Sequence, residues 1–138
     1  TIDKTNSQLV NTETAIKDEQ PDPVVVEYPV AYIERDLTAI DGAPAQFAIL
    51  NPAQFNPGAQ LLIKRNAFAD SPATNLTASV FGEDELIDIR DLSISDDGQQ
   101  MLMAIRAPEL EGVDDDEQPS WNIWRYSVFY QRFVCTSC

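Results

Sequence analysis

The stretch IRDLSISDDGQQMLMAIR, residues 89–106, indicates the fold of this chain more clearly than any other part of it. Two apolar or alternating runs flank Asp97 and Gly98, and an Asp-Gly pair supplies the positive φ angles that a type I′ hairpin turn requires. In the first run Leu92 and Ile94 alternate with serines, which predicts a strand with one solvent-facing side. The second run, MLMAI at 101–105, is apolar throughout and predicts a strand buried on both faces.

Other segments rich in β-branched or aromatic residues predict the remaining strands. These are VAYIER at 30–35, AQLLIKR at 59–65, a short edge strand at 75–77, and WNIWRYSVFYQRFV at 121–134, read as one long strand or a pair. Loops rich in proline, glycine or acidic residues separate them, and the ordered part shows no convincing helical period. The sequence therefore predicts an all-β class with about four to six short strands.

The N-terminal part has a different composition. Residues 1–23 are polar and end in two prolines, so we expect a disordered acidic and polar tail that buries too little apolar surface to order itself. The tail has two interpretations: a flexible tether, for example from a membrane anchor, or a leader without a role. The ordered domain is expected over residues 24–134, followed by a CxxC motif at 135–138.

Charge and composition exclude several classes of function. The chain of 138 residues has 9 Lys and Arg against 23 Asp and Glu, a formal charge of −14, and no histidine. Without histidine, Ser-His-Asp and Cys-His catalysis and the Cys₂His₂ zinc pattern are absent, which argues against an enzyme. The negative charge opposes contact with nucleic acid and anionic membranes and favours cationic partners. No apolar run approaches the length of a membrane-spanning helix.

A degenerate repeat runs through the ordered part. VAYIERD at 30–36 is similar to MLMAIRA at 101–107, because both are apolar runs that end in arginine before a long loop. AQLLIKRN at 59–66 is similar to WNIWRYSV at 121–128, because both follow that loop and carry a basic residue after the apolar residues. A unit of strand, long loop and strand is thus expected twice.

These pieces resemble a known family. DLSISDDGQQMLMAIRAPE, followed by WNIWRY, resembles the blade motif of TolB-like, WD-repeat-like β-propellers. YPVAYIERDL, FNPGAQLLIKRNAFADSPATNLT and DDDEQPSWNIWRY are most similar to the hydrazine synthase alpha-subunit propeller and its uncharacterised bacterial relatives, over residues 28–126. The resemblance implies blade-type folding and a periplasmic or extracellular location. It does not imply hydrazine chemistry, because this chain has no histidine to ligate haem iron.

The length of the chain limits what the resemblance can imply. A blade takes about 40–45 residues and a propeller closes with about four to eight blades. We therefore expect a partial β-propeller of about two blades, which is a fragment, a truncated product or a chain completed by another. The expected partners are a protein or the remaining blades, and such a piece is expected to oligomerise or to be poorly stable alone.

The C-terminal pair Cys135 and Cys138 has several interpretations. CxxC followed by histidine is the attachment signature of c-type haem, and haem would become plausible if the gene continued with that residue. The pair also suits a redox couple or half of a metal site. The simplest interpretation is two incidental cysteines at an altered terminus, and we favour it.

Acidic and aromatic residues offer weaker candidates. Asp114, Asp115, Asp116 and Glu117 could bind calcium, but their spacing is not that of an EF-hand, so a solvated loop is the favoured interpretation. The cluster 83–88 is weaker still. An aromatic stripe over 121–133 is expected to be core rather than a ligand platform. Arginines at strand ends are expected to form surface pairs with Asp36, Asp88 or Asp91.

The sequence leaves three functional hypotheses. The leading one is an exported, non-enzymatic propeller segment that serves as a binding or scaffolding module. The second is a truncated piece of a c-type haem-bearing enzyme or electron-transfer protein. The third is an extracellular calcium-binding module.

Overall fold

A computed structural model describes residues 28–38, 42 and 54–138, and this part of the chain is built from two antiparallel sheets. The predicted all-β class is confirmed. The strands are β1 (Val30–Arg35), β2 (Ala59–Lys64), β3 (Ala73–Asn75), β4 (Asp88–Ile94), β5 (Gln100–Arg106), β6 (Trp121–Ser127) and β7 (Arg132–Cys135). The predicted tail 1–23 and the predicted domain start at 24–27 lie outside the described residues.

Both sheets follow the order of the sequence. The first has the order β1-β2-β3 and the second the order β4-β5-β6-β7. The predicted strands at 30–35 and 59–65 are confirmed with a difference of one residue at Arg65, and residues 121–134 form a pair of strands, β6 and β7. Each sheet is thus a meander, in which strands that follow one another in the sequence pair with each other.

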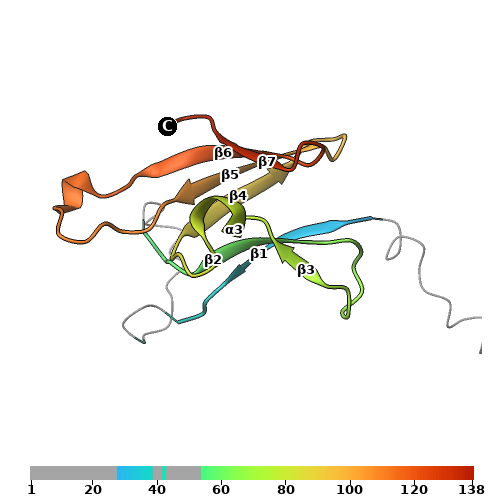
Figure 1. Ribbon diagram of the computed structural model, residues 1–138, viewed down its shortest axis with the longest axis horizontal. Helices are drawn as coiled ribbons and strands as arrows, with labels where there is room; N and C mark the ends of the chain where they lie inside the picture. Colours follow the sequence, from blue (N-terminus) through green and yellow to red (C-terminus); the bar gives the residue numbers. More distant parts are fainter. Residues whose placement is uncertain (1–27, 39–41, 43–53) are drawn as a thin grey trace, which may run out of the picture.

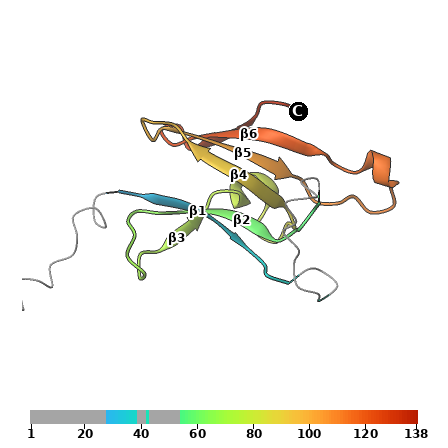
Figure 2. The ribbon, with the colours of Figure 1, turned by 180° about the vertical axis from the view of Figure 1, so that it is seen from behind.

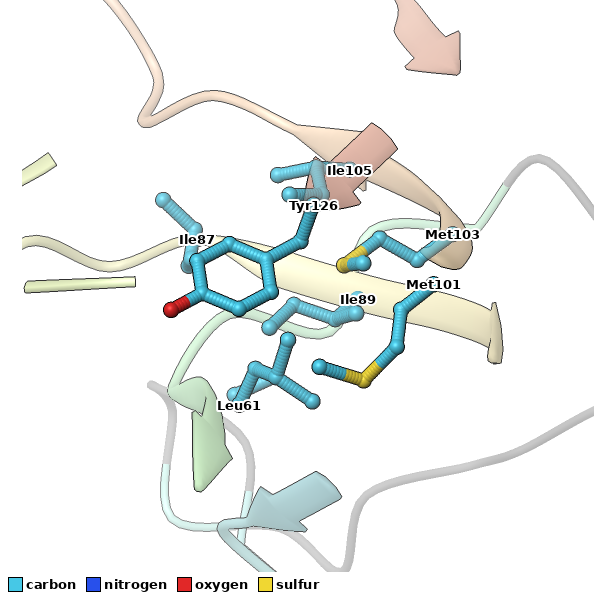
Figure 3. Close-up of a cluster of buried hydrophobic side chains, with 8 residues drawn as sticks. Leu61, Ile87, Ile89, Met101, Met103, Ile105 and Tyr126 are labelled. Atoms are coloured by element: carbon cyan, nitrogen blue, oxygen red, sulfur yellow. The ribbon is translucent and has the colours of Figure 1, made fainter. Parts of the chain in front are cut away.

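The two sheets lie one above the other and enclose the core between them (Figures 1 and 2). Leu61 of β2 lies beneath Ile89 and Met101, and Tyr126 of β6 closes the cluster (Figure 3). The buried hydrophobic residues are Ala59, Leu61, Ile87, Ile89, Met101, Met103, Ile105 and Tyr126. Because these side chains come from both sheets, burial of apolar surface holds the sheets together.

The hairpin predicted at residues 89–106 is confirmed, but its turn is not type I′. Gly98 has a φ of 70°, whereas Asp97 is not among the residues with positive φ, which a type I′ turn would require. The strands close at Ser95, whose N–H donates to the carbonyl of Gln100 (2.9 Å). Asp97 sets the turn by accepting from the Gln99 N–H (3.0 Å) and the Ser95 hydroxyl (2.6 Å). These side-chain bonds favour a longer loop than a two-residue turn.

The region after β2 also differs from the prediction. The edge strand expected at 75–77 is β3, at Ala73–Asn75, and a short helix α3 (Ala78–Phe81) follows it. Thr77 explains the shift, because its buried hydroxyl accepts from the Leu61 N–H of β2 (3.2 Å) and donates to Asn75 Oδ1 (2.9 Å). That hydroxyl replaces a strand bond, so the strand ends there and the chain turns into α3.

Strand β5 is buried on one face rather than on both. Met101, Met103 and Ile105 point into the core at 1% exposure, whereas Leu102 is 46% exposed. The apolar run predicts a second cover on the other side, and no described strand or helix supplies one (Figure 1). The outer face of this sheet therefore exposes apolar side chains that no described element covers.

The two copies of the predicted sequence repeat pair their strands in the same register. In the first sheet Arg35 is opposite Ala59, Ile33 opposite Leu61, and Ala31 opposite Ile63. In the second sheet Arg106 is opposite Trp121, Ala104 opposite Ile123, and Leu102 opposite Arg125. The pairs β1–β2 and β5–β6 thus have the same register relative to the repeated sequence. Residues at equivalent positions occupy the same face of their sheets, since faces alternate along a strand.

Candidate functional site

The most densely bonded polar cluster lies where one end of the two sheets meets. Its centre is Asp88 at the start of β4, which is fully buried at 0% exposure. The segment before β2 closes this end, because the N–H groups of Gly58 and Ala59 both donate to the carbonyl of Ile87 (2.9 and 3.0 Å). Gly58 has a φ of 102°, a conformation that favours glycine.

The carboxylate of Asp88 is satisfied on both oxygens. Oδ1 lies 3.4 Å from Nη1 of Arg35, and Oδ2 lies 3.3 Å from Nη2 of Arg90. The backbone N–H of Asn56 also donates to Oδ2 (2.9 Å). Burying a carboxylate is costly unless it is paired and hydrogen-bonded, and these three donors meet that condition.

The two arginines extend the cluster to the backbone. Arg35 donates to the carbonyl of Ile89 in the facing sheet, and Arg90 donates to the carbonyl of Gln54. Arg90 also lies over the ring of Trp121, 4.7 Å from its centre. The cluster therefore joins β1, β4, β6 and the segment before β2. A buried ion-pair network of this kind fixes the relative positions of the elements that it joins.

The predicted pairing of strand-end arginines with Asp88 is confirmed for Arg35 and Arg90, but the pairs are not on the surface. Asp88 is fully buried, while the two arginine side chains are 24% and 21% exposed. Arg106 is bonded differently, because its guanidinium lies 4.5 Å from the ring centre of Phe55 and 4.0 Å from Glu109. The Nε of Arg106 is buried without a hydrogen-bond partner among the described residues.

The C-terminal motif forms a disulfide between Cys135 and Cys138. The loop that it closes is bonded to the start of β6. The N–H and hydroxyl of Thr136 donate to the carbonyl of Ile123 (2.8 and 2.9 Å), and the Ile123 N–H donates to the hydroxyl of Ser137 (2.8 Å). The motif therefore extends β7 along β6 rather than standing apart as a frayed end.

Attachment of c-type haem needs two free thiols and a histidine after the second cysteine, so the haem site that depends on that histidine stays a prediction. Both sulfurs are joined to each other in the disulfide. The chain also has no histidine to ligate the iron. We derive no haem chemistry from this site.

The acidic loop is ordered but does not gather its carboxylates. Asp115–Glu117 form a short 3₁₀ helix with Asp114 before it, and all four side chains are exposed. The loop is closed by Gln118, whose side chain accepts from the Leu110 N–H (2.9 Å) and donates to its carbonyl (3.0 Å). Within residues 28–38, 42 and 54–138, no three acidic or cysteine side chains are placed to hold a metal ion.

The aromatic stripe is divided between the core and the surface. Trp124, Tyr126 and Phe133 pack on the core, with the rings of Tyr126 and Phe133 4.7 Å apart, and burial raises the pKa of Tyr126. The expectation of core packing is confirmed for these three. It is wrong for Phe129 and Tyr130, which are 78% and 75% exposed at the turn between β6 and β7. There the two rings pack edge to face, 5.0 Å apart.

Two surface hollows carry opposite charges. One, of about 250 Å³, lies beside the first sheet, and its charged lining is Glu34, Arg35, Asp36, Glu83, Asp84 and Glu85. The other, of about 450 Å³, lies on β6 and β7 and is lined by Arg125, Ser127, Tyr130, Arg132 and Val134. Neither hollow was predicted from the sequence, because each combines residues from separate strands or loops.

Comparisons with known proteins add no relative: no family model, curated protein or solved structure matches this chain. In the described part, no helix is long and apolar enough to cross a membrane. The resemblance to TolB-like propellers therefore stays a prediction from the sequence.

Proposed function

We propose that this chain is an exported, non-enzymatic binding or scaffolding module built from about two propeller-type blades. The observation that carries the proposal is the repeated register, in which β1–β2 and β5–β6 pair in equivalent positions within two stacked sheets. Stacked meanders of about four strands are the building units of β-propellers. The second sheet has this number of strands in this order.

Two features of the chemistry support a binding role over catalysis. Among the described residues, the buried carboxylate of Asp88 is occupied by three protein donors. The surface, in contrast, carries exposed apolar side chains on a sheet face that no described element covers, and two hollows of opposite charge. Such features are typical of interaction surfaces.

The disulfide supports an exported location. Disulfides persist in oxidising compartments and are rare in the cytosol, so the Cys135–Cys138 bond suits a periplasmic or extracellular protein. The experiment that tests location and haem together is expression from the natural gene in its own host, followed by fractionation and intact mass analysis. We expect the product outside the cytoplasm, two hydrogen atoms lighter than the dithiol and without a haem absorbance band. A cytoplasmic dithiol, or a covalently attached haem, would contradict the proposal.

A further inference from the structure

The outer face of the second sheet has the composition of a contact surface. Strands β5, β6 and β7 contain three arginines and no acidic residue, in a chain with a formal charge of −14. Leu102, Ile123 and Val134 are 46%, 45% and 37% exposed on this face. An apolar surface bordered by arginines is typical of protein interfaces. We call this surface, with Arg125 and Arg132, the arginine face.

The sequence repeat relates the arginine face to a surface of the first sheet. Ala104 and Ile123 of the arginine face occupy the positions of Ile33 and Leu61 in the first sheet. Leu61 is completely buried by the neighbouring sheet, and Ile33 packs on the same cluster. The arginine face is therefore the equivalent of a surface that another sheet covers.

The arginines repeat in the same way. Arg35 ends β1 and bonds to Asp88 and the Ile89 carbonyl of the sheet stacked on it. Arg106 ends β5 at the equivalent position, but its ion pair is only a 4.0 Å contact with the exposed Glu109. Its buried Nε has no hydrogen-bond partner in the described part of the chain. Within the described residues, no further sheet is stacked on Arg106 in the way that the second sheet is stacked on Arg35.

A separate surface, beside the end of β1, the start of β2 and the segment that follows α3, supplies the complementary charge. Glu34, Asp36, Glu83, Asp84 and Glu85 line the hollow beside the first sheet. We call this surface the acidic hollow. Two arginine faces would repel each other, whereas an arginine face and an acidic hollow attract. The charges therefore favour a head-to-tail contact between different surfaces over a two-fold contact between identical ones.

We propose that the arginine face binds the acidic hollow of a second copy of this chain, so that copies associate head to tail. This inference rests on the proposed blade-type repeat and names the partner of the module. In this contact, Arg125 and Arg132 of one copy face Glu83 and Glu85 of the next.

The test is sedimentation velocity of the full chain and two charge-reversal variants over a range of concentrations. We expect the wild type to associate reversibly, and both R125E/R132E and E83K/E85K to associate at least about tenfold more weakly. Mixing the two variants in equal amounts restores association, because each reversed surface then meets its reversed counterpart. The control D114K/D116K makes the same charge change in the acidic loop and is expected to associate as the wild type does.

Several results would overturn the inference. A wild type that stays monomeric at every concentration removes the second copy as the occupant. Unchanged association of E83K/E85K, together with loss in R125E/R132E, indicates a two-fold contact instead. Failure of the mixture to associate also contradicts a head-to-tail contact. Nuclear Overhauser contacts between Leu61 and Met101 distinguish failure of this inference from failure of the proposed function. If the chain is monomeric and these contacts are present, only the contact between copies is contradicted. If the contacts are absent, the stacked repeat that supports the proposed function is contradicted as well.

Discussion

Arg35 of β1 lies 3.4 Å from the buried carboxylate of Asp88 in the facing sheet, and this ion pair joins the two sheets at the end where the chain passes between them. Asp88 binds Arg90 of its own strand through the other oxygen. The buried carboxylate thus fixes the position of β1 relative to β4. It complements the apolar core, which favours contact between the sheets without setting their alignment.

Replacing Asp88 with asparagine is expected to destabilise the chain strongly. The change leaves two guanidinium groups next to a neutral side chain, and breaking a buried pair costs about 3–5 kcal/mol. We expect the lower end of this range, because the arginine side chains keep 24% and 21% exposure to solvent. Urea unfolding measures the loss. The control is E109Q, which removes an exposed carboxylate 4.0 Å from Arg106 and should cost about 0–1 kcal/mol. Equal effects of the two substitutions would contradict the role of Asp88.

The hydroxyl of Thr77 gives a second prediction. It accepts from the buried Leu61 N–H, so T77V leaves a buried donor unsatisfied at nearly constant side-chain volume. We expect a loss of about 1–3 kcal/mol in the free energy of unfolding. The control T74V makes the same change at an exposed position of β3 and should stay within about 0.5 kcal/mol of the wild type. A T77V variant as stable as T74V would show that the hydroxyl does not terminate the strand.

The turn at Asp97 predicts a dependence on pH. The Ser95 hydroxyl, followed by the Gln99 N–H, stabilises the charged carboxylate and lowers the pKa of Asp97. Because the folded pKa lies below the unfolded one, the contribution of Asp97 to stability is complete above the unfolded pKa. It is lost as the pH falls through the folded pKa.

Comparison of the wild type with D97N over a pH series measures this contribution. We expect the wild type to be the more stable at neutral pH, with a difference that shrinks as the pH is lowered. D96N removes a carboxylate one residue away and is the control for net charge. A difference between wild type and D97N that stays constant down to acidic pH would exclude the proposed bonds of Asp97.

The disulfide is expected to contribute modestly. It closes a loop of only four residues, from Cys135 to Cys138, for which chain entropy gives about 2 kcal/mol. The bonds of Thr136 to Ile123 do not depend on the sulfurs. The variant C135S/C138S should therefore stay folded, with loss of about 2 kcal/mol or less by urea unfolding. Complete unfolding of this variant would show that the motif anchors the second sheet rather than only its edge.

The strands were predictable where the sequence carries a period or a clear composition. Residues 30–35 have bounds in the structure identical to those predicted, and the two halves of the hairpin at 89–106 lie on either side of Gly98 as expected. These segments combine alternating or apolar runs with a turn residue at the boundary. Local chemistry decides such cases, and it is visible in one sequence.

The parts that could not be predicted depend on contacts between distant residues. Asp88 belongs to an acidic cluster that predicts a solvated loop. Its burial depends on partners distant in the sequence, Arg35, which lies 53 positions earlier, and the Asn56 N–H, which lies 32 positions earlier. The helix α3 has four residues, too few to show a helical period, and it begins where Thr77 bonds to Leu61. The apolar run in β5 predicted burial on two faces, but one face remains uncovered in the described chain.

The central claim is that the two meanders stack on each other, with Leu61 of one sheet against the β4 and β5 residues of the other (Figure 3). Methyl nuclear Overhauser spectra of the full chain test it most directly. The stacked repeat predicts contacts from the Leu61 methyl groups to Ile89 and Met101, together with cross-strand contacts within each sheet. Cross-strand contacts without any contact from Leu61 to Ile89 or Met101 would show that the sheets fold but do not stack, and would contradict the account.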